Sequence, residues 1–570
     1  MNHVPADAAP RSGVERLKET SRRLRGDLLN ELVSDALEVS EDAYNLLKFH
    51  GTYEQHDRDT ATPRKQAGLA KEYSFMVRVR MPGGRLSGAQ YLALDMLADR
   101  YSKAGMRITT RQGIQFHGVV KGNLKPAIAE INATLLTTQS ACGDVARNLM
   151  VTPAPRRDAR HQRLLDDARM LAANLLPASR AYHQIFLDEA EDAGAGQEEE
   201  PLYGPTYLPR KFKIALAEPA DNTVDVLCND LGLIAVFEGD HLAGYNLALG
   251  GGLGMTHNRA DTYPRLASIL GFVPAEEVLA ATRAVIGLHR DFGNRADRKR
   301  ARLKYLLDDR GIDWAVAALS ALLGHKLAPP RPTAPLAVPD LLGWHEEGGG
   351  TWWLGVAIPS GRIADGPIRY RGALRAVIAR YGCTPIMTPQ QDILLSGIAA
   401  EDRAGAAALL ASFGLRVPEG ESMLARWTLA CPALPTCGLA LTEAERVREP
   451  IIAALDPVLA RHGLAQERIS LRITGCPNGC ARSYAGDIGL VGRVPGAYAI
   501  FVGGDFAGTR LSFKLLERVR QDDLPGVLEP LLAAFATERA PNEGFGDFCN
   551  RMGKSALLGL IAAARPAAAQ

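Results

Sequence analysis

The segment TTRQGIQFHG (109–118) aligns without gaps to the later segment TPQQDILLSG (388–397). A second matching pair precedes these segments, MPGGRL at 81–86 and IPSGRI at 358–363. The spacing between the two motifs is also similar, 27 residues from Pro82 to Thr109 and 29 residues from Pro359 to Thr388. These matches predict an internal duplication, in which two related units pair about a pseudo-two-fold axis.

The two copies of the repeat differ in chemistry. We expect 107–117 to form one strand, in which alternate residues share a face. One face of that strand would then hold Arg107, Thr109, Arg111, Gln115 and His117. The positions of the last three are taken in the second copy by Gln390, Leu394 and Ser396. A purely structural strand has no need of two arginines and a histidine on one face, so the first copy is predicted to bind an anionic ligand.

Length, charge and hydropathy exclude several classes of protein. The chain has 570 residues and a formal net charge of +2. Its length suggests roughly three or four domains, and its net charge gives no sign of nucleic-acid binding. We find no apolar run long enough to span a membrane and no secretory signal at the N-terminus. We therefore expect a cytoplasmic protein, whose thiols stay reduced.

Four of the eight cysteines form two close pairs, Cys431 with Cys437 and Cys476 with Cys480. Four thiolates can hold a [4Fe–4S] cluster. Zinc is the competing ligand, although zinc sites usually show tighter C-x-x-C spacing. A disulfide pair is disfavoured in the cytosol, and a chance grouping of core cysteines is the remaining alternative. Proline and glycine around both pairs let backbone N–H groups approach the sulfurs closely.

The motifs around these cysteines resemble those of the sulfite and nitrite reductase haemoproteins, and most of all the assimilatory sulfite reductases. The resemblance covers about residues 20–555. It is carried by ACPALPTCGLALTEAER (430–446), TGCPNGCARSYAGDIGLVG (474–492), FHGTYEQHDRD (49–59), RVRMPGG (78–84), RITTRQGIQFHG (107–118), YGPTYLPRKFK (203–213), GYNLALGGGLG (244–254), NRADRKRARLKYL (294–306) and NEGFGDF (542–548).

The resemblance implies an α/β (α+β) fold with a pseudo-two-fold duplicated, three-domain architecture. The proline-rich stretch 327–340 is the best linker candidate. The expected division is an N-terminal wrapping segment (1–69), a duplicated ferredoxin-like central domain (70–145 and 345–420), a haem-enclosing α/β domain (146–344) and a C-terminal α/β domain with the cysteines (421–570).

The resemblance also implies two cofactors, a [4Fe–4S] cluster and a sirohaem. The cluster would be held by Cys431, Cys437, Cys476 and Cys480, and Cys480 would also ligate the sirohaem iron. Sirohaem carries many carboxylates, which arginine binds well because its planar guanidinium group can donate two parallel hydrogen bonds. The residues that match positions lining the macrocycle are Arg107, Arg111, Gln115, His117, Arg210 and Asn478.

A small anion, sulfite or nitrite, is the expected substrate. Four basic residues match the family's substrate face: Arg78, Arg147, Lys211 and Lys213. We assign anion binding to the two arginines. We assign proton delivery to the two lysines, because crowded cations lower a lysine pKa toward neutrality.

The electron donor must be another protein, because we find no nucleotide-binding G-x-G-x-x-G fingerprint. By resemblance the donor is an NADPH-dependent flavoprotein or a ferredoxin. The expected reaction is the six-electron reduction of sulfite to sulfide, with nitrite reduction to ammonia as the runner-up. Two further alternatives are an electron-transfer iron–sulfur protein without catalysis and a zinc-stabilised binding module. No membrane or nucleic-acid partner is expected.

Overall fold

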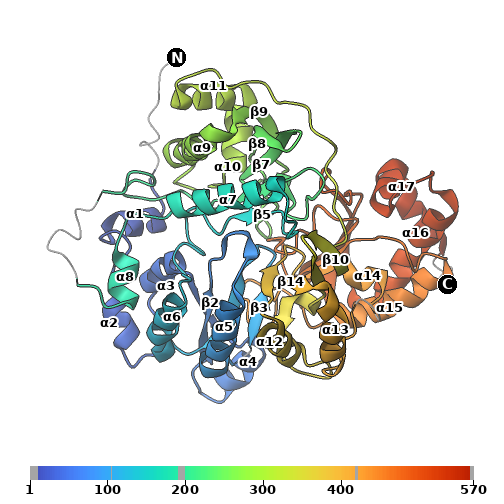
Figure 1. Ribbon diagram of the computed structural model, residues 1–570, viewed down its shortest axis with the longest axis horizontal. Helices are drawn as coiled ribbons and strands as arrows, with labels where there is room; N and C mark the ends of the chain where they lie inside the picture. The colour runs from blue at the N-terminus through green and yellow to red at the C-terminus, as the bar shows by residue number, and fades with distance from the viewer. Residues whose placement is uncertain (1–9, 104, 191–198, 418–420, 565–570) are drawn as a thin grey trace.

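The computed structural model describes residues 10–103, 105–190, 199–417 and 421–564. Within these residues the strands form four sheets with helices packed around them (Figure 1). The N-terminal half of the duplication lies at the lower left of Figure 1, the elements of the third sheet at the top and the C-terminal elements at the right. No helix in the described ranges is long and apolar enough to cross a membrane.

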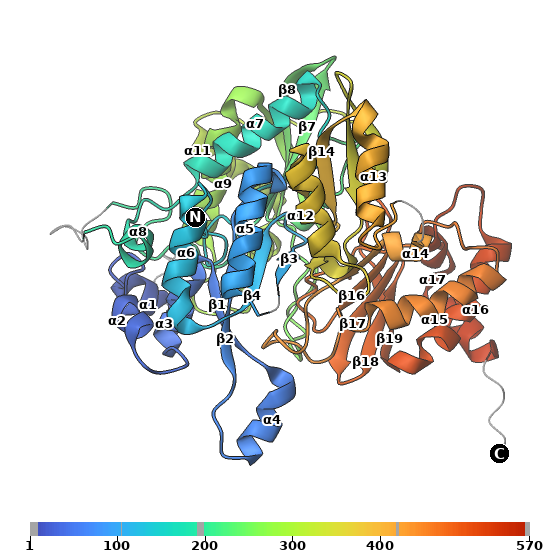
Figure 2. The same cartoon turned by 60° about the horizontal axis from the view of Figure 1, so that its bottom comes forward.

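The first two sheets come from the predicted duplication. The first sheet is antiparallel, and its strands in spatial order are β1 (Thr52–His56), β2 (Tyr73–Arg78), β4 (Ile114–Val119), β3 (Met106–Ile108) and β12 (Arg362–Ile363). The strands of the second sheet, also antiparallel, are β10 (Gly343–Gly348), β11 (Thr351–Val356), β14 (Ile393–Ala399) and β13 (Thr384–Met387). Each half then contributes two helices: α5 (Gly88–Tyr101) and α6 (Leu124–Ala133), and α12 (Tyr370–Tyr381) and α13 (Arg403–Ala411). Helices α5 and α12 lie side by side (Figure 2).

The two halves exchange short segments at their contact. Strand β12 of the second half pairs with β3 of the first, and Arg85 of the first half bridges to Ile386 of the second. Both segments follow a Pro-x-Gly turn with a left-handed glycine, Gly84 at φ +71° and Gly361 at φ +71°. This reciprocal pairing confirms the predicted duplication and its pseudo-two-fold relation.

We expect Gly361→Ala to destabilise the protein by about 3 kcal/mol, because the new Cβ meets two obstacles. It would lie 2.2 Å from the carbonyl oxygen of Ile108, and the backbone is left-handed at this position. Thermal unfolding of Gly361→Ala measures the loss. Gly366→Ala is the control, because no atom lies within 4 Å of a Cβ there. Equal unfolding temperatures for the two variants would contradict this account of the turn.

The predicted continuous strand at 107–117 is wrong. The structure has a hairpin instead, in which β3 ends at Ile108 and β4 begins at Ile114. The intervening turn is closed by a hydrogen bond from Thr109 N to the Gly113 carbonyl (2.8 Å), and Gln112 adopts a left-handed conformation (φ 52°). Thr109 and Arg111 therefore lie in a loop, where strand alternation does not apply.

A second duplication, which the sequence analysis missed, relates the third and fourth sheets. The strands of the third sheet are β5 (Met150–Val151), β6 (Ile214–Ala217), β7 (Leu231–Glu238), β8 (His241–Leu249) and β9 (Ser268–Pro274). Those of the fourth sheet are β15 (Thr428–Ala430), β16 (Leu471–Thr474), β17 (Ile488–Val494), β18 (Ala497–Val502) and β19 (Phe513–Arg520). In both sheets the first three strands are parallel and the last two add antiparallel.

Helices cover the outside of these sheets (Figures 1 and 2). Those not yet named are α1 (Gly13–Thr20), α2 (Leu28–Val33), α3 (Glu41–Leu47), α4 (Arg58–Gln66), α7 (Ala159–Asn174), α8 (Ala181–Phe186), α9 (Val278–Phe292), α10 (Leu303–Arg310), α11 (Ile312–Leu323), α14 (Met423–Arg426), α15 (Arg448–Arg461), α16 (Leu524–Glu538) and α17 (Phe545–Ala564). One large apolar core joins the first three sheets, and the C-terminal sheet has its own core with α15, α16 and α17. The predicted domain boundaries stay a prediction.

Candidate active site

One face of the first sheet is polar although the strands are buried. The register places Gln115 opposite both Arg78 and Arg107, so the three side chains share that face. His117 lies two residues along the same strand and points the same way. With its amide oxygen turned toward Arg78, Gln115 accepts hydrogen bonds from Arg78 Nε (3.1 Å) and Nη2 (2.5 Å). The opposite face packs into the apolar core, as expected for Phe116 and its neighbours.

The edge of this polar face is tied to the cysteine loop. The Nη2 atom of Arg107 donates to the carbonyl of Ala430 (2.8 Å), the residue before Cys431. Its Nε atom lies 3.2 Å from Glu445, which also pairs with Arg362 at 2.7 Å. Arg107 therefore lies beside the cysteine loop, where it shares the single negative charge of Glu445 with Arg362. Its role as a carboxylate-binding residue stays a prediction.

A cavity joins the first sheet to the C-terminal cysteine loop. Its walls include five of the predicted residues, Arg111, Lys211, Lys213, Asn478 and Cys480. The loop that carries Arg111 also contacts the cysteine loop directly, because Thr110 Oγ1 donates to the Cys480 carbonyl (3.1 Å). Residues more than 250 positions apart thus meet around one space.

The two lysines present free ammonium groups to this cavity. Both side chains are half-buried, and in the described part of the chain neither Nζ atom has a hydrogen-bond or ion-pair partner. Burial, Arg111 and Arg302 lower the pKa of Lys213 to about 7. Burial and the charges of Arg210 and Lys213 hold the pKa of Lys211 well below its ordinary value. A bound anion would raise both pKa values, because it supplies the missing opposite charge.

The other predicted cations lie next to the cavity, where protein groups hold them. Arg78 Nη1 donates to Cys142 Sγ (2.9 Å), and Arg147 donates to the carbonyl of Gly143 (3.1 Å) and to the Tyr53 hydroxyl (3.4 Å). The charge of Arg147 lowers the pKa of both Arg111 and Lys211, so it acts on the same space.

Arg210 belongs to a neighbouring ion network. Its guanidinium group lies 3.8 Å from the buried carboxylate of Asp144, which also pairs with Arg298 at 2.7 Å. These cations hold the pKa of Asp144 well below its ordinary value, although burial opposes them. Arg210 is not among the residues that line the cavity. Its predicted contact with the macrocycle therefore stays a prediction.

The four thiols of the predicted cluster site lie close enough to affect one another. The charge of Cys480 raises the pKa of the other three, after burial, which has the larger effect. The pKa of Cys476 reaches about 12, so iron would have to displace its proton.

Two sulfurs of this set already accept hydrogen bonds. Cys431 Sγ accepts from Gly475 N (3.3 Å), and Cys476 Sγ accepts from Asn478 Nδ2 (3.6 Å). Such donors stabilise thiolates on a metal. No three His, Cys, Asp or Glu residues of the described ranges are arranged for a single metal ion. The hydrogen bonds to the sulfurs and the lack of a single-ion site are both compatible with a four-iron cluster, which binds its four thiolates at four separate iron atoms.

The residues fit the two cofactors that the sequence predicts. Four grouped thiols suit an iron–sulfur cluster, and Cys480 is exposed on the cavity side of the group. The cavity wall is cationic, which suits a macrocycle with many carboxylates. Two buried nitrogens have no hydrogen-bond partner in the described ranges, Nε of the lining residue Arg111 and Nε2 of His117 on the polar face of the first sheet. His117 also has a pKa well below its ordinary value, because it is buried among cations.

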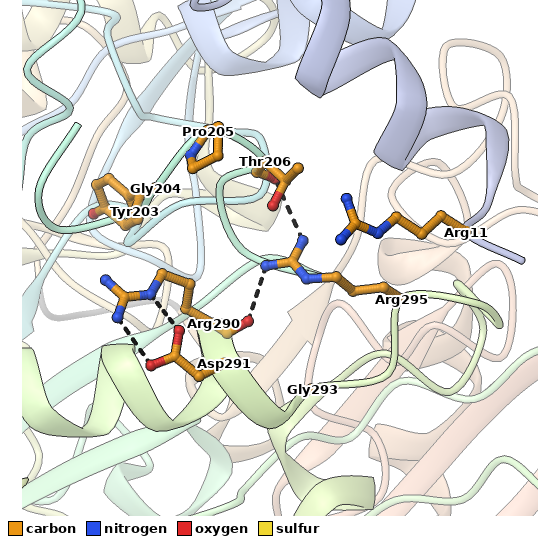
Figure 3. Close-up of a pocket in the computed structure, with 9 residues that line it drawn as sticks. All are labelled: Arg11, Tyr203, Gly204, Pro205, Thr206, Arg290, Asp291, Gly293 and Arg295. Carbon is orange, nitrogen blue, oxygen red and sulfur yellow. Dashed lines mark hydrogen bonds and ion pairs between the residues drawn. The ribbon is translucent and has the colours of Figure 1, made fainter. Parts of the chain in front are cut away.

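A second cavity is lined by arginines whose guanidinium groups already bind acceptors of the protein. It lies between the segment at Tyr203–Thr206 and the end of α9 (Figure 3). There Arg290 pairs with Asp291 (2.6 Å), and Arg295 donates to the carbonyl of Arg290 (2.9 Å) (Figure 3). Because these guanidinium groups bind protein acceptors, this cavity differs from the one at Cys480, where two lysines have no partner in the part of the chain that the structure describes.

Sequence reasoning missed two residues of the site, Tyr53 and Arg302. Tyr53 shares the polar face of the first sheet and bonds to Arg147, while Arg302 lines the cavity beside Lys213. Tyr53 lies in the motif FHGTYEQHDRD and Arg302 in the motif NRADRKRARLKYL, which both carry the family resemblance. The signal was therefore present, but nothing in either motif shows which residue turns toward the cavity.

Comparisons with known proteins give a consistent result. Residues 166–327 match the nitrite and sulphite reductase 4Fe-4S domain, and residues 68–134 and 345–413 match the nitrite/sulfite reductase ferredoxin-like half domain. The first match ends before the four cysteines; its range contains four of the five strands of the third sheet, which shares its topology with the cysteine-bearing fourth sheet.

Whole-chain relatives agree with these matches. The chain is 48% identical over 95% of its length to the sulfite reductase (NADPH) hemoprotein beta-component of Xanthomonas campestris, 97% of which is covered. It is 45% identical over 97% of its length to the same component of Myxococcus xanthus, with 98% covered. The solved structure of Mycobacterium tuberculosis NirA protein superposes with a TM-score of 0.79 at 25% identity, covering 96% of this chain and 98% of that one. The chain therefore belongs to the nitrite and sulfite reductase family.

Proposed function

We propose that the protein reduces sulfite to sulfide at a sirohaem coupled to a [4Fe–4S] cluster, as the haemoprotein component of a sulfite reductase. The observation that carries the proposal is the cavity lined by Cys480 and by two lysines whose Nζ atoms have no partner among the described residues. Sulfite reductase relatives at 48% and 45% identity over nearly the whole chain support it.

Each predicted residue has a defined task in this proposal. Cys431, Cys437, Cys476 and Cys480 would hold the cluster, and Cys480 would also be the residue that holds the haem iron. When bound, the two cofactors would relay electrons from the donor protein and provide the site at which sulfite is reduced. Asn478 keeps the Cys476 sulfur hydrogen-bonded, as it already is at 3.6 Å.

The cationic residues bind the anions and supply protons. Arg111 and Arg107 would bind the carboxylates of the macrocycle, together with Gln115, His117 and Arg210. Arg78 and Arg147 bind sulfite, which is attracted to the cationic wall. Conversion of HSO₃⁻ to HS⁻ consumes six protons and releases three waters, so proton donors must be recharged repeatedly. Lys213 suits this task best, because its pKa of about 7 lets it both lose and regain a proton near neutrality.

Electrons are proposed to come from NADPH through a flavoprotein partner. The name of the relatives contains NADPH, and the quoted motifs of this chain contain no nucleotide-binding fingerprint. The reaction is proposed to take place in the cytoplasm, where the thiols would stay reduced.

The experiment is a visible spectrum of the purified protein followed by turnover with a reduced viologen dye. We expect sirohaem and iron–sulfur absorption and faster reduction of sulfite than of nitrite. A colourless protein, or one that reduces only nitrite, would overturn the proposal. Turnover with NADPH plus a flavoprotein, compared with reduced ferredoxin, then tests the donor: activity with ferredoxin alone would reject the flavoprotein.

A further inference from the structure

The motif NRADRKRARLKYL (294–306) has no task in the proposed function, although it supplies part of the cavity. Arg302 lines the cavity and binds Asp230. Two residues later, the Lys304 ammonium group donates to the carbonyls of Gly252 and Gly254 (2.9 Å each). The motif therefore fixes loops that surround the proposed reaction space.

The ion pair of Arg302 and Asp230 is buried and is held by several hydrogen bonds. Asp230 is fully buried, and Arg302 binds it through Nε (3.0 Å) and Nη2 (2.8 and 2.9 Å). The second carboxylate oxygen of Asp230 also accepts the backbone N–H of Lys213 (2.9 Å). One buried carboxylate thus joins an arginine to the residue that we assign to proton delivery.

The fourth sheet has a carboxylate equivalent to Asp230, but the backbone N–H that it accepts belongs to a serine instead of a lysine. There Asp487 accepts the backbone N–H of Ser470 (2.8 Å) just before β16, as Asp230 accepts that of Lys213 just before β6. Asp487 binds the Ser470 hydroxyl (2.6 Å) and Gly546 N (3.0 Å), and in the described ranges it has no ion-pair partner. The shared hydrogen bond belongs to the fold, whereas an arginine paired with the carboxylate is found, among the described residues, only beside the lysine; at Asp487 the charge of Arg472 acts without an ion pair, because Arg472 binds Asp225.

We propose that the ion pair of Arg302 and Asp230 is the positioning device for Lys213. Asp230 fixes the Lys213 backbone at the start of β6, and Arg302 holds Asp230 in place and keeps a positive charge beside the cavity. Neither side chain transfers a proton itself. The inference rests on the proposed function, because Lys213 needs positioning only if it delivers protons.

The charges in the cavity support this assignment. The positive charge of Arg302 contributes to the lowered pKa of Lys213, after burial and Arg111, while Asp230 acts in the opposite direction. A misplaced proton donor slows catalysis strongly even when substrate still binds, because proton transfer needs hydrogen-bond contact. Loss of the pair should therefore affect kcat more than KM.

The test compares Arg302→Met and Arg302→Lys in the holoenzyme. We expect Arg302→Met to lower kcat for sulfite by about tenfold or more while KM changes less than about twofold. Arg302→Lys keeps the charge without the planar guanidinium group, so we expect it to recover part of the loss. Hydrogen exchange of the Lys213 amide, followed by mass spectrometry on cofactor-free protein, should be about tenfold faster in Arg302→Met.

Asp487→Asn is the matched control, because it alters the equivalent carboxylate of the fourth sheet. We expect faster exchange at Ser470 rather than Lys213, with kcat within about twofold of wild type. Unchanged kcat and unchanged Lys213 exchange in Arg302→Met would overturn the inference, and so would an equal loss of kcat in Asp487→Asn. If wild type does not reduce sulfite, the proposed function fails, and the exchange rates still decide whether the pair anchors Lys213.

Discussion

Cys480→Ser is expected to abolish sulfite reduction and to disturb the spectra of both cofactors. Of the four cysteines, Cys480 is the one that lines the cavity, and the charge of its thiolate also acts on the other cysteines. A serine hydroxyl is a much poorer iron ligand than a thiolate, so under the proposed function the cluster would lose one of its four ligands and the haem iron would lose its protein ligand. We expect turnover to fall by about a thousandfold or more. Visible absorption, iron and sulfide content and dye-linked turnover measure the three effects.

The control for this variant is Cys549→Ala. Cys549 is also a C-terminal cysteine, but unlike the exposed Cys480 it is buried, on α17 in the apolar core. We expect it to lower the unfolding temperature while both cofactors and turnover remain. Normal spectra and normal rates in Cys480→Ser would remove the bridging thiolate from the mechanism. Loss of the cluster with a normal haem spectrum would show that another residue ligates the haem iron.

The duplication could be predicted because it repeats residues as well as shape. Gln112 and Gln391 stand at equivalent positions, and both adopt a left-handed conformation (φ 52° and 74°). Both donate through Nε2 to a backbone carbonyl of the preceding Pro-x-Gly turn, Gly83 at 3.3 Å and Ser360 at 3.0 Å. A local motif with such specific bonds keeps its sequence, so an alignment finds it.

The second duplication could not be predicted in the same way. The third and fourth sheets share strand order and direction, yet their strands are short apolar runs that many sequences satisfy. What they share in sequence is one short stretch at the start of a strand, DLGL at 230–233 in one and DIGL at 487–490 in the other. A match of four residues is a weak signal to find in 570 residues.

The site residues were predicted by type and only partly by position. Periodicity correctly grouped Gln115 with His117, but it could not reveal the turn that separates Arg111 from Arg107. Nor could it show that Glu445, 338 residues away, pairs with Arg107. Whether a cationic side chain is free to bind a ligand depends on the residues that contact it in the folded protein. Those residues can lie far away in the sequence, so the sequence alone does not identify them.

Lys213→Met is expected to keep both cofactor spectra and to lower kcat for sulfite by about a hundredfold. Methionine preserves most of the side-chain volume but cannot carry a proton. Lys213 has no hydrogen-bond partner for its Nζ atom within the described ranges, so its removal leaves no buried group unsatisfied. Spectra, the unfolding temperature and steady-state kinetics with a reduced dye provide the measurement.

The pH dependence separates proton delivery from simple charge loss. Because the pKa of Lys213 is about 7, its protonated fraction falls as the pH rises above that value. A bound anion raises the pKa, so wild-type kcat should decline on the alkaline side at or above pH 7. Lys213→Met should lack this decline, since the group that titrates is gone. The exposed Lys299, in the same basic motif, is the control, and Lys299→Met should keep the wild-type profile. An unchanged alkaline decline in Lys213→Met would assign the proton donor to another residue, with Lys211 the first to examine.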